Sequence, residues 1–557
     1  MNKNCTQCAT SFTVTDEERA FYEKASPVFN RKKELIPEPT LCVECRFQRR
    51  VAHRNERTLS YRTCDKTQKK ILSAYSQEKP FVVYEQKEWW KDDWDARDYG
   101  QDIDFNRPFF EQFAELQKKV PRMALQQENN ENSDYTNNVS YLKDCYWMFS
   151  SDYNRDCCFG TWIQHCQDCY DALSLNECEQ CYECVYSKNL YNCQYSFNCS
   201  SCRDSMFLFD CYNCKDCFMC WGLQGKQYYI LNKPYSKEKY FEKLHEFPLS
   251  SYQNREAAKE RYRKILKEEA FHPPTLMHGN LENSDGDLLV DCQNCHDCYH
   301  VIGGKDCQYV NNAYKVEDMR DCSFVSGELA YESCECFPSP YHSAFNLNTY
   351  RGSNLFYCDM CMNDCKDCFG CVGLKKAQYC ILNKQYHKDE YEEIVPKLIE
   401  HMRKTGEWGE FFPINISPYS YNESQVMDYF PLSREEVKQN GWRWKSEEKK
   451  EDHAKSTYEL PDLIEKVQDD IRERILIDES GKPYKIIPQE LQFYRKMGIP
   501  IPRKSPEQRH LDRLHLFNSK KLWDRSCPKC GTEFKSTFAP ESEEKVLCKE
   551  CYYKNLE

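Results

Sequence analysis

Long apolar runs are missing from this chain of 557 residues. It contains no run of about 18 apolar residues that would span a membrane, and the N-terminal stretch MNKNCTQCAT has no apolar signal core. We therefore expect no membrane partner and a cytoplasmic location. In that compartment the 37 cysteines should be reduced or bound to metal rather than paired as disulfides. Secretion by another route would reverse this expectation.

The familiar catalytic motifs are missing too. We find no nucleophile elbow, P-loop, dinucleotide fingerprint or HExxH sequence, and the 13 histidines do not cluster. Weak catalytic hints are His165 beside Cys166 and His300 near Cys298. The net charge of −12 argues against indiscriminate nucleic-acid binding by the whole chain. These absences predict a non-enzymatic protein.

What the chain has in excess is cysteine at a spacing of three. From Cys145 to Cys220, every third residue is Cys or another residue that is small or apolar, with Asn154 as the strongly polar exception. A period of three fits neither a helix nor a flat strand. It fits a narrow β-solenoid whose small side chains point inward, and the recurrence of Cys at 145, 157, 169, 181 and 193 favours about 12 residues per turn.

The Cys-rich stretch occurs twice. Glu131-Asn-Ser133 returns as Glu282-Asn-Ser284, and the segment from Cys217 returns from Cys368, in both cases 151 positions later. The common offset indicates a tandem duplication. In the second copy the spacing of three ends at Glu328, so we expect a loop or distorted turn in FPSPYHSAFNLNTYRGSN before the pattern resumes at Cys358.

Two pairs of CxxC motifs lie near the ends of the chain. Their spacing is typical of zinc ribbons, in which four thiolates surround one ion. The candidate ligands are Cys5, Cys8, Cys42 and Cys45 at the head, and Cys527, Cys530, Cys548 and Cys551 at the tail. The sequence therefore predicts about two Zn²⁺ per chain.

The tail sequence resembles the head sequence. TLCVECRFQRR aligns with RKSPEQRHLDR, which places Ser505 and Gln508 opposite Cys42 and Cys45. The segment Cys64-Asp-Lys-Thr67 aligns with Cys527-Pro-Lys-Cys530. We infer an ancestral unit with two zinc sites, of which the head kept the first and the tail kept the second.

Arginines follow the first ribbon and recur in the tail. On a helix several of them would share a face that could meet phosphates of RNA or single-stranded DNA. The alternative is a solvated face, or ion pairs with acids of the same chain such as Asp92, Asp93 and Asp95. The candidate nucleic-acid residues are Arg46, Arg49, Arg50, Arg54, Arg57, Arg503, Arg509 and Arg513.

Together these patterns predict a multidomain α+β protein. Two tandem Cys-rich short-turn β-solenoid modules would be flanked by zinc-ribbon domains and joined by short helical connectors. The expected order is an N-terminal zinc ribbon with a degenerate second ribbon (1–90), an acidic aromatic segment and helix (91–130), the first solenoid (131–247), a helical connector (248–281), the second solenoid (282–404), an irregular connector (405–475) and the C-terminal zinc ribbon (476–557).

The whole chain resembles bacterial zinc-ribbon-containing proteins with Cys-rich tandem repeats. The stretches that carry the resemblance are TLCVECRFQRRVAHRNER, NRPFFEQFAELQKKVPR, the CxxC triplets, ILNKPYSKEKY, SPYSYNESQVMDYFPL and FYRKMGIPIPR. The resemblance implies zinc ribbons and a Cys-rich repeat and assigns no reaction.

Three functions stay open on the sequence alone. The first is a non-enzymatic scaffold or binding protein that grips nucleic acid or a protein partner through its ribbons. The second is metal storage or thiol redox buffering by the CxxC ladder. Against the second, Ser, Leu, Ala and Ile replace Cys at equivalent positions, as expected of packing residues rather than ligands. The third is an enzyme.

Overall fold

The computed structural model describes residues 2–170, 173–176, 185–276, 278–338, 340–446 and 458–556. Cys178, Cys181 and Cys184, which belong to the predicted triplet series, lie outside these ranges. The chain forms two compact units, and each is discontinuous in sequence. Unit 1 contains 1–126 and 278–446, and unit 2 contains 127–277 and 447–557.

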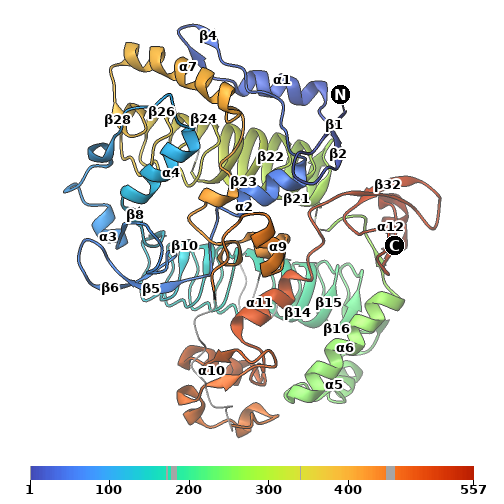
Figure 1. Ribbon diagram of the computed structural model, residues 1–557. Coiled ribbons are helices and arrows are strands. Elements are labelled where there is room, and N and C mark those ends of the chain that lie inside the picture. Colours follow the sequence, from blue (N-terminus) through green and yellow to red (C-terminus); the bar gives the residue numbers. More distant parts are fainter. Residues whose placement is uncertain are drawn as a thin grey trace. The chain divides into compact units, whose positions relative to one another are not determined.

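Each unit is built around a stack of β-coils, which confirms the predicted β-solenoid (Figure 1). In unit 1 the sheet order is β20 to β28, and in unit 2 the sheets are β9 to β11 and β12 to β18. Pairing is parallel except at the last strand pair of each stack. The unit 1 strands are β20 (His278–Glu282), β21 (Gly286–His296), β22 (Cys298–Gln308), β23 (Asn311–Cys336), β24 (Tyr341–Ala344), β25 (Ser353–Phe356), β26 (Lys366–Phe369), β27 (Gln378–Ile381) and β28 (Lys384–Gln385). Those of unit 2 are β9 (Gln127–Glu128), β10 (Asn137–Ser140), β11 (Phe149–Asp152), β12 (Leu173–Asn176), β13 (Val185–Lys188), β14 (Tyr191–Ser200), β15 (Arg203–Phe209), β16 (Lys215–Trp221), β17 (Gln227–Ile230) and β18 (Lys233–Pro234).

A left-handed residue at every third position explains the coil. From Asn132 to Asp168 every third residue has a positive φ, and each one directly precedes an inward residue, as Asp144 precedes Cys145. A left-handed residue turns the chain sharply, so four triplets close one coil of 12 residues. Strand pairing confirms this length, because Cys193 lies opposite Ser205. Asn and Asp tolerate this conformation best, which accounts for their frequency between the cysteines.

The interior of each coil stack is narrow and made largely of thiols and aliphatic side chains. In unit 2 the core includes Cys199, Cys211 and Leu208, and in unit 1 it includes Cys295 and Val301. Interior thiols donate to carbonyl groups of their own coil, as Cys217 Sγ does to Lys215 O at 3.3 Å. Cysteine therefore suits this core because it is small and satisfies a buried carbonyl group.

From Tyr341 onward, the stretch FPSPYHSAFNLNTYRGSN, where we expected a loop or distorted turn, forms a distorted turn of the coil stack. Strand β24 (Tyr341–Ala344) begins within it and pairs with β23, with Glu328 opposite Tyr341. The pairing spans thirteen positions (328 to 341) instead of twelve, so this coil contains an extra residue, and a second coil does too, since Ser353 lies opposite Lys366. A single inserted residue shifts the spacing of three without interrupting the sheet.

Helices and small hairpins cover the coil stacks. In unit 1 they are β1 (Asn2–Asn4), β2 (Ser11–Thr13), α1 (Asp16–Ala25), β3 (Val28–Phe29), β4 (Lys32–Lys33), α2 (Val43–Val51), β5 (Ser60–Thr63), β6 (Lys70–Ser73), β7 (Val83–Tyr84), α3 (Gln86–Trp89), η1 (Ala96–Tyr99), α4 (Phe109–Lys119), β8 (Arg122–Met123), α7 (Lys388–Thr405), η2 (Ile414–Ile416), η3 (Tyr421–Glu423), α8 (Val426–Tyr429) and α9 (Arg434–Gln439). In unit 2 they are α5 (Lys237–Leu244), α6 (Tyr252–Glu268), β19 (Phe271–His272), η4 (Ile464–Lys466), η5 (Asp469–Glu473), β29 (Leu476–Ile477), β30 (Pro483–Tyr484), α10 (Pro488–Met497), α11 (Pro506–Leu514), β31 (Trp523–Ser526), β32 (Glu533–Ser536), β33 (Lys545–Val546) and α12 (Lys549–Leu556).

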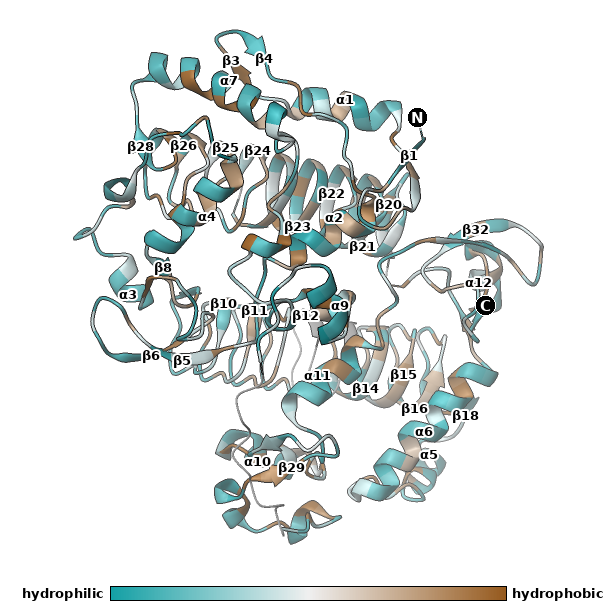
Figure 2. Ribbon diagram, viewed as in Figure 1, coloured by the Kyte–Doolittle hydropathy of each residue, from teal (hydrophilic) through white to brown (hydrophobic). Residues whose placement is uncertain are grey.

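The covering helices use a few apolar residues as anchors. Helix α6 is mostly hydrophilic (Figure 2), and its buried Tyr262 donates to Cys220 O of the unit 2 coils at 2.7 Å. In unit 1, the Phe109 ring of α4 lies 5.5 Å from Tyr357 and 5.7 Å from Phe369. The coils therefore form a scaffold on which the covering helices are seated.

Candidate metal centres

The first candidate metal centre lies at the head of the chain, in unit 1. The side chains of Cys5, Cys8, Cys42 and Cys45 converge so that all four Sγ atoms lie within 4.8 Å of one another. Cys5 and Cys8 come from the turn between β1 and β2, and Cys42 is the N-cap residue of α2. The sulfur atoms of Cys8 and Cys42 are 3.6 Å apart. This confirms that the two CxxC motifs meet across the intervening chain.

A tight turn holds the first two thiols of this centre. The N–H of Cys5 donates to Thr10 O at 2.9 Å, and the N–H of Ala9 donates to Cys5 O at 2.9 Å. Ala9 has a φ of 62°. The backbone therefore curls around the sulfur atoms. Burial raises the pKa of Cys5, but backbone N–H groups of Cys42, Cys8 and Gln7 lower it and favour the thiolate.

The second candidate centre has the same construction at the tail, in unit 2. Its ligands are Cys527, Cys530, Cys548 and Cys551, whose Sγ atoms also lie within 4.8 Å of one another. The turn between β31 and β32 repeats the head geometry, because Cys527 N donates to Thr532 O at 2.9 Å and Gly531 N to Cys527 O at 2.8 Å. Gly531 has a φ of 75°, where glycine is the least strained residue.

The donor sets fit a tetrahedral metal ion. With a metal–sulfur distance of about 2.3 Å, a tetrahedron has sulfur–sulfur edges of about 3.8 Å. The measured separations are 3.6 Å for Cys8–Cys42 and 3.6 Å for Cys530–Cys548. They are far longer than a disulfide bond of about 2.05 Å. Two groups of four cysteines that could hold one metal ion each are thus present, near the two ends of the chain.

Local hydrogen bonds lower the pKa of two thiols in each centre, Cys5 and Cys42 at the head and Cys527 and Cys530 at the tail. The pKa of Cys42 is lowered to about 6, chiefly because the Cys45 thiol donates to its sulfur. Burial alone would raise the pKa of Cys527, but backbone N–H groups of Cys548, Cys530 and Lys529 lower it to about 6. A thiolate is the form that binds metal, so both centres are prepared for a cation at neutral pH.

The arginines of the head lie inside unit 1. Arg46 and Arg50 are 1% and 0% exposed, and Arg49 and Arg54 are also buried. Arg46 Nη2 lies 2.9 Å from Asp321 Oδ2, and Arg50 Nη1 lies 3.3 Å from Asp321 Oδ1. The remaining pairs are Arg46 and Arg50 with Glu332, Arg49 with Glu332 and Glu410, Arg54 with Glu335 and Glu56, and the bidentate pair of Arg57 with Asp428.

The tail arginines occupy similar positions in unit 2. Arg509 is buried and donates to Glu490 Oε1 at 3.1 Å and to the Tyr494 hydroxyl at 2.8 Å. Arg513 is buried too, and the Arg503 guanidinium lies 4.2 Å from the centre of the Tyr252 ring.

Buried guanidinium groups have no access to a phosphate. We therefore correct the expectation of exposed nucleic-acid contacts at Arg46, Arg49, Arg50, Arg54, Arg509 and Arg513, and assign these residues to the packing of α2 and α11. Internal pairing was the alternative that the sequence left open. Its expected partners Asp92, Asp93 and Asp95 are not those found, since the pairs form with coil residues such as Asp321 and Glu332.

The interior cysteines that the structure describes do not assemble into further metal centres. Within the described ranges, only the head and tail sets bring three or more potential ligand atoms within 4.8 Å of one another. The interior thiols instead donate to carbonyl groups, as Cys145 does to Lys143 O at 3.3 Å. This geometry favours packing over metal storage.

The two histidines with neighbouring cysteines do not form catalytic pairs. His165 is exposed and stacks on Tyr153 at 4.9 Å, whereas Cys166 belongs to the core of the coil. His300 Nδ1 lies 3.0 Å from Asn312 Oδ1, and Cys298 is an interior residue. Only every third residue of a coil points inward, so an outward histidine beside an inward cysteine in the sequence does not contact its thiol.

Comparisons with known proteins assign no family to the chain. No family model matches it, and no curated protein matches it. One similar solved structure is a protein from Desulfovibrio desulfuricans G20 described as an acetyltransferase, with 10% sequence identity and a TM-score of 0.11. The match covers 50% of this chain and 81% of that protein. Values this low carry no argument about fold or activity. No helix in the described ranges is long and apolar enough to cross a membrane.

Proposed function

We propose that the chain is a non-enzymatic structural scaffold that binds one zinc ion in each of two zinc ribbons. The observation that carries the proposal is the closure of both sites by four protein thiols. A catalytic zinc site keeps one position open for water or substrate, whereas a structural site has four protein ligands. The ions would hold the ribbon segments in shape and perform no reaction.

Zinc is the metal we propose, although a tetrahedral set of four sulfurs also suits iron. Elemental analysis of the purified chain, with an absorption spectrum, distinguishes the two. We expect about two zinc ions per chain and no visible absorption band. A folded protein that is purified with no bound metal, before any chelator is added, would overturn the proposal. An iron content of about two per chain would show that the metal is iron.

The coils would act as the framework of the scaffold. Support comes from the interior thiols, which are buried and donate to carbonyl groups rather than converging on a metal position. If the CxxC ladder stored metal, the chain would bind roughly six or more soft metal ions. Titration with Zn²⁺ or Cd²⁺ should instead saturate at about two ions per chain.

A reducing compartment, the cytoplasm, suits these free thiols. None of the cysteines in the described ranges forms a disulfide, including the many packed inside the coils. Counting thiols in protein denatured without reductant should recover all 37. A shortfall in even numbers would indicate disulfides and an oxidising compartment.

We further propose that the chain belongs with the zinc-ribbon-containing proteins that it resembles, and that its partner is a protein. The burial of the ribbon arginines removes the main argument for nucleic acid. Pull-down of the intact chain from native lysate, with and without nuclease, tests the partner class. A complex that survives nuclease is expected, and a nuclease-sensitive complex would favour nucleic acid.

A further inference from the structure

The head contains a hairpin that matches the hairpin of the tail metal centre. Strands β5 and β6 pair with Ser60 opposite Ser73, and β31 and β32 pair with Trp523 opposite Ser536. Each residue of the head pair lies 463 positions before its counterpart in the tail pair (60 to 523 and 73 to 536). The turns match as well, since Cys64 N donates to Lys69 O at 2.8 Å, just as Cys527 N donates to Thr532 O at 2.9 Å.

The match extends to the second half of the tail centre. The N–H of Glu85 donates to Cys64 Sγ at 3.3 Å, and the N–H of Cys548 donates to Cys527 Sγ at 3.5 Å. Helices α3 and α12 then begin at residues 86 and 549, again 463 positions apart. The counterparts of the four tail ligands are therefore Cys64, Thr67, Glu85 and Glu88.

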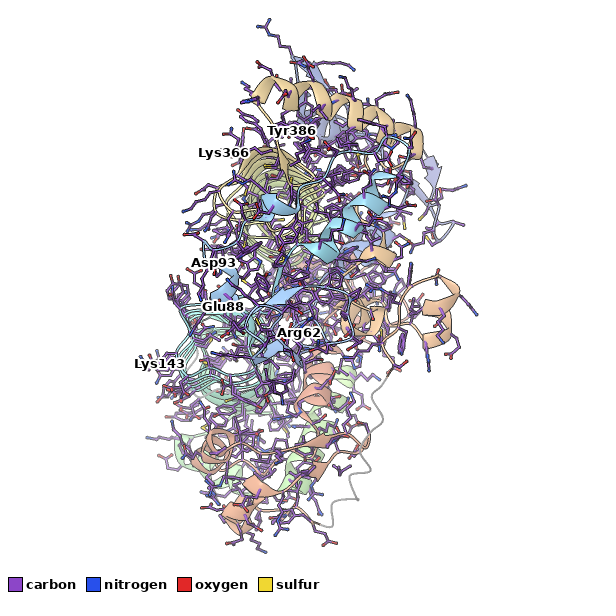
Figure 3. All side chains as sticks on the ribbon, turned by 60° about the vertical axis from the view of Figure 1, so that its left-hand side comes forward. Arg62, Glu88, Asp93, Lys143, Lys366 and Tyr386 are labelled. Carbon is purple, nitrogen blue, oxygen red and sulfur yellow. The ribbon has the colours of Figure 1, made fainter. Side chains whose placement is uncertain are left out.

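Within the described chain, the residues of this head hairpin do not form a set of converging metal ligands. Side-chain contacts instead connect its turn with α3 and the residues that follow α3. Lys66 of the turn pairs with Glu88 at 3.5 Å and with Asp93. Glu88 and Asp93 lie near one another in Figure 3. The thiol of Cys64 accepts the Glu85 N–H, as its counterpart in the tail accepts the N–H of Cys548. Ion pairs and hydrogen bonds join the turn to α3 where thiolates and a metal would join them in the tail.

The tail also contains a counterpart of the head metal centre. Asp478 takes the place of Cys5, in a turn one residue shorter, where Asp478 N donates to Lys482 O at 3.0 Å and Gly481 N to Asp478 O at 2.9 Å. The counterparts of the head ligands are Asp478, Ser480, Ser505 and Gln508. Ser505 is the N-cap of α11, as Cys42 is of α2.

A single carboxylate joins the parts of this tail counterpart. Asp478 Oδ1 accepts from the N–H groups of Ser480 and Lys482, both at 2.9 Å, and from the Ser480 hydroxyl at 2.7 Å. Its Oδ2 accepts from the N–H of Ser505 at 3.3 Å. The carboxylate thus links the turn to the start of α11, as a metal ion would link the turn to α2.

All four centres share one further feature. The residue that directly follows the fourth ligand position is buried in every case, and it contacts the coils of its own unit. These residues are Arg46, Trp89, Arg509 and Tyr552.

The contacts of these four anchors differ in chemistry. In unit 1, Arg46 pairs with Asp321, and Trp89 packs in a cluster with Met360 and Met362. In unit 2, the guanidinium of Arg509 lies 4.8 Å from the Phe159 ring centre, and Tyr552 donates to Asp210.

We infer that the four centres are copies of one docking element, whose task is to hold this anchor residue on the coils. The inference rests on the proposed structural role of the metal. It adds that the metal holds the anchor residue in place on the coils. Two copies keep the metal, and two are vestigial metal sites, at Cys64, Thr67, Glu85 and Glu88 and at Asp478, Ser480, Ser505 and Gln508. In the vestigial copies hydrogen bonds and ion pairs replace the ion, and the anchor stays in place.

Restoring the missing ligands in the full-length chain tests the inference. The variant Thr67→Cys/Glu85→Cys/Glu88→Cys, with Gln68→Gly to match Gly531, should raise the zinc content by one ion per chain over the unmodified protein. The control Thr67→Ser/Glu85→Ser/Glu88→Ser, also with Gln68→Gly, should show no increase. A folded cysteine variant with unchanged zinc content would overturn the vestigial-site assignment. An unmodified chain without any metal would instead overturn the proposed function.

Hydrogen exchange of the unmodified chain gives a test that needs no variant. Removal of metal by a chelator should cause loss of protection around α2 and α12. Protection around α3 and α11 should persist, because hydrogen bonds and ion pairs, not a metal ion, join the turn to each of these helices. Equal loss at α3 and α12 would overturn the inference, whether or not the cysteine variant folds.

Discussion

Tyr552 donates its phenol hydrogen to the buried carboxylate of Asp210. Tyr552 follows the candidate metal ligand Cys551, and Asp210 belongs to the coils of the same unit. Asp210 also accepts from the Tyr212 hydroxyl at 2.9 Å and from Asn198 Nδ2 at 2.6 Å. The bond from Tyr552 ties the tail segment to the scaffold, so the stability of the two should be coupled.

We predict that Tyr552→Phe destabilises unit 2 by about 1–3 kcal/mol, because a buried carboxylate oxygen loses its donor. The free energy of unfolding in urea measures the change. Tyr553→Phe is the matched control, since Tyr553 is 52% exposed and its replacement should have almost no effect. Equal stability of the two variants would show that the Tyr552–Asp210 bond does not hold the segment in place.

Removing two ligands should remove one ion. In Cys527→Ser/Cys530→Ser we expect the zinc content to fall from about two to about one per chain, because two thiolates hold zinc poorly. Limited proteolysis should then cut near α12 and leave the head intact. Cys64→Ser is the control and should keep both ions. Loss of metal from Cys64→Ser would mean that this thiol is a ligand.

The coil interior should tolerate small residues and reject charge. Cys217 is fully buried, so Cys217→Ala should cost about 1 kcal/mol, whereas Cys217→Asp would bury an unpaired charge and should prevent folding. Lys215→Asp, on the exposed face two positions earlier, is the control and should fold normally. Soluble yield and circular dichroism compare the three variants. Normal folding of Cys217→Asp would refute the inward register.

The coils and the candidate metal ligands could be predicted from the sequence, because each is defined by a short spacing between residues. A narrow coil requires a small residue at every inward position, so the spacing of three is visible in the order of residues. Thiolate ligands likewise have few substitutes, and CxxC spacing identified both tetrads. The left-handed corners were harder to see, because Tyr, Trp and Phe occupy some of them along with Asn and Asp.

Contacts between distant segments could not be predicted. Arg46 and its partner Asp321 are separated by the whole of the first solenoid, and nothing near either residue indicates the pair. Asp321 directly precedes the inward Cys322, and many other acidic residues hold the same place before an inward cysteine. For the same reason the sequence order of ribbons and coils did not show that residues 1–126 pack on 278–446. The short-range spacing patterns therefore predicted the coils and the ligands, but not which segments pack together in each unit.

The buried ion pairs of α2 should be essential for stability. Asp321→Ala would leave Arg46, Arg49 and Arg50 to share the carboxylate of Glu332 in a buried site. Because an excess of positive charge would then be buried, we expect a loss of about 3–5 kcal/mol in the free energy of unfolding. The loss should change little with salt, because buried charges are poorly screened.

Lys24→Ala is the matched control for this variant. It removes a more exposed partner, of Asp318, and should cost under about 1 kcal/mol. Urea unfolding at low and high salt compares the two variants. A loss for Asp321→Ala as small as that of the control would show that the buried pairs do not hold α2 on the coils.

The vestigial centre of the tail should depend on pH through Asp478. Burial would raise the pKa of this carboxyl, but hydrogen bonds from Ser480, Ser505 and Lys482 lower it to about 2 in the folded chain. The unfolded value is about 3.9. A carboxyl whose pKa is depressed by folding stabilises the fold above its unfolded pKa, and that contribution disappears as the pH falls from about 4 to about 2.

The variant Asp478→Asn should therefore be less stable than the unmodified chain near pH 7, with a difference that shrinks below about pH 4. Thermal unfolding of metal-free protein between about pH 7 and pH 3 isolates this effect, because acid would otherwise also release the zinc. Asp512→Asn serves as the control, since Asp512 is half-exposed and pairs with Lys504 on the surface of the same helix region. A stability difference for Asp478→Asn that is constant across this pH range would show that the carboxylate charge does not join the turn to α11.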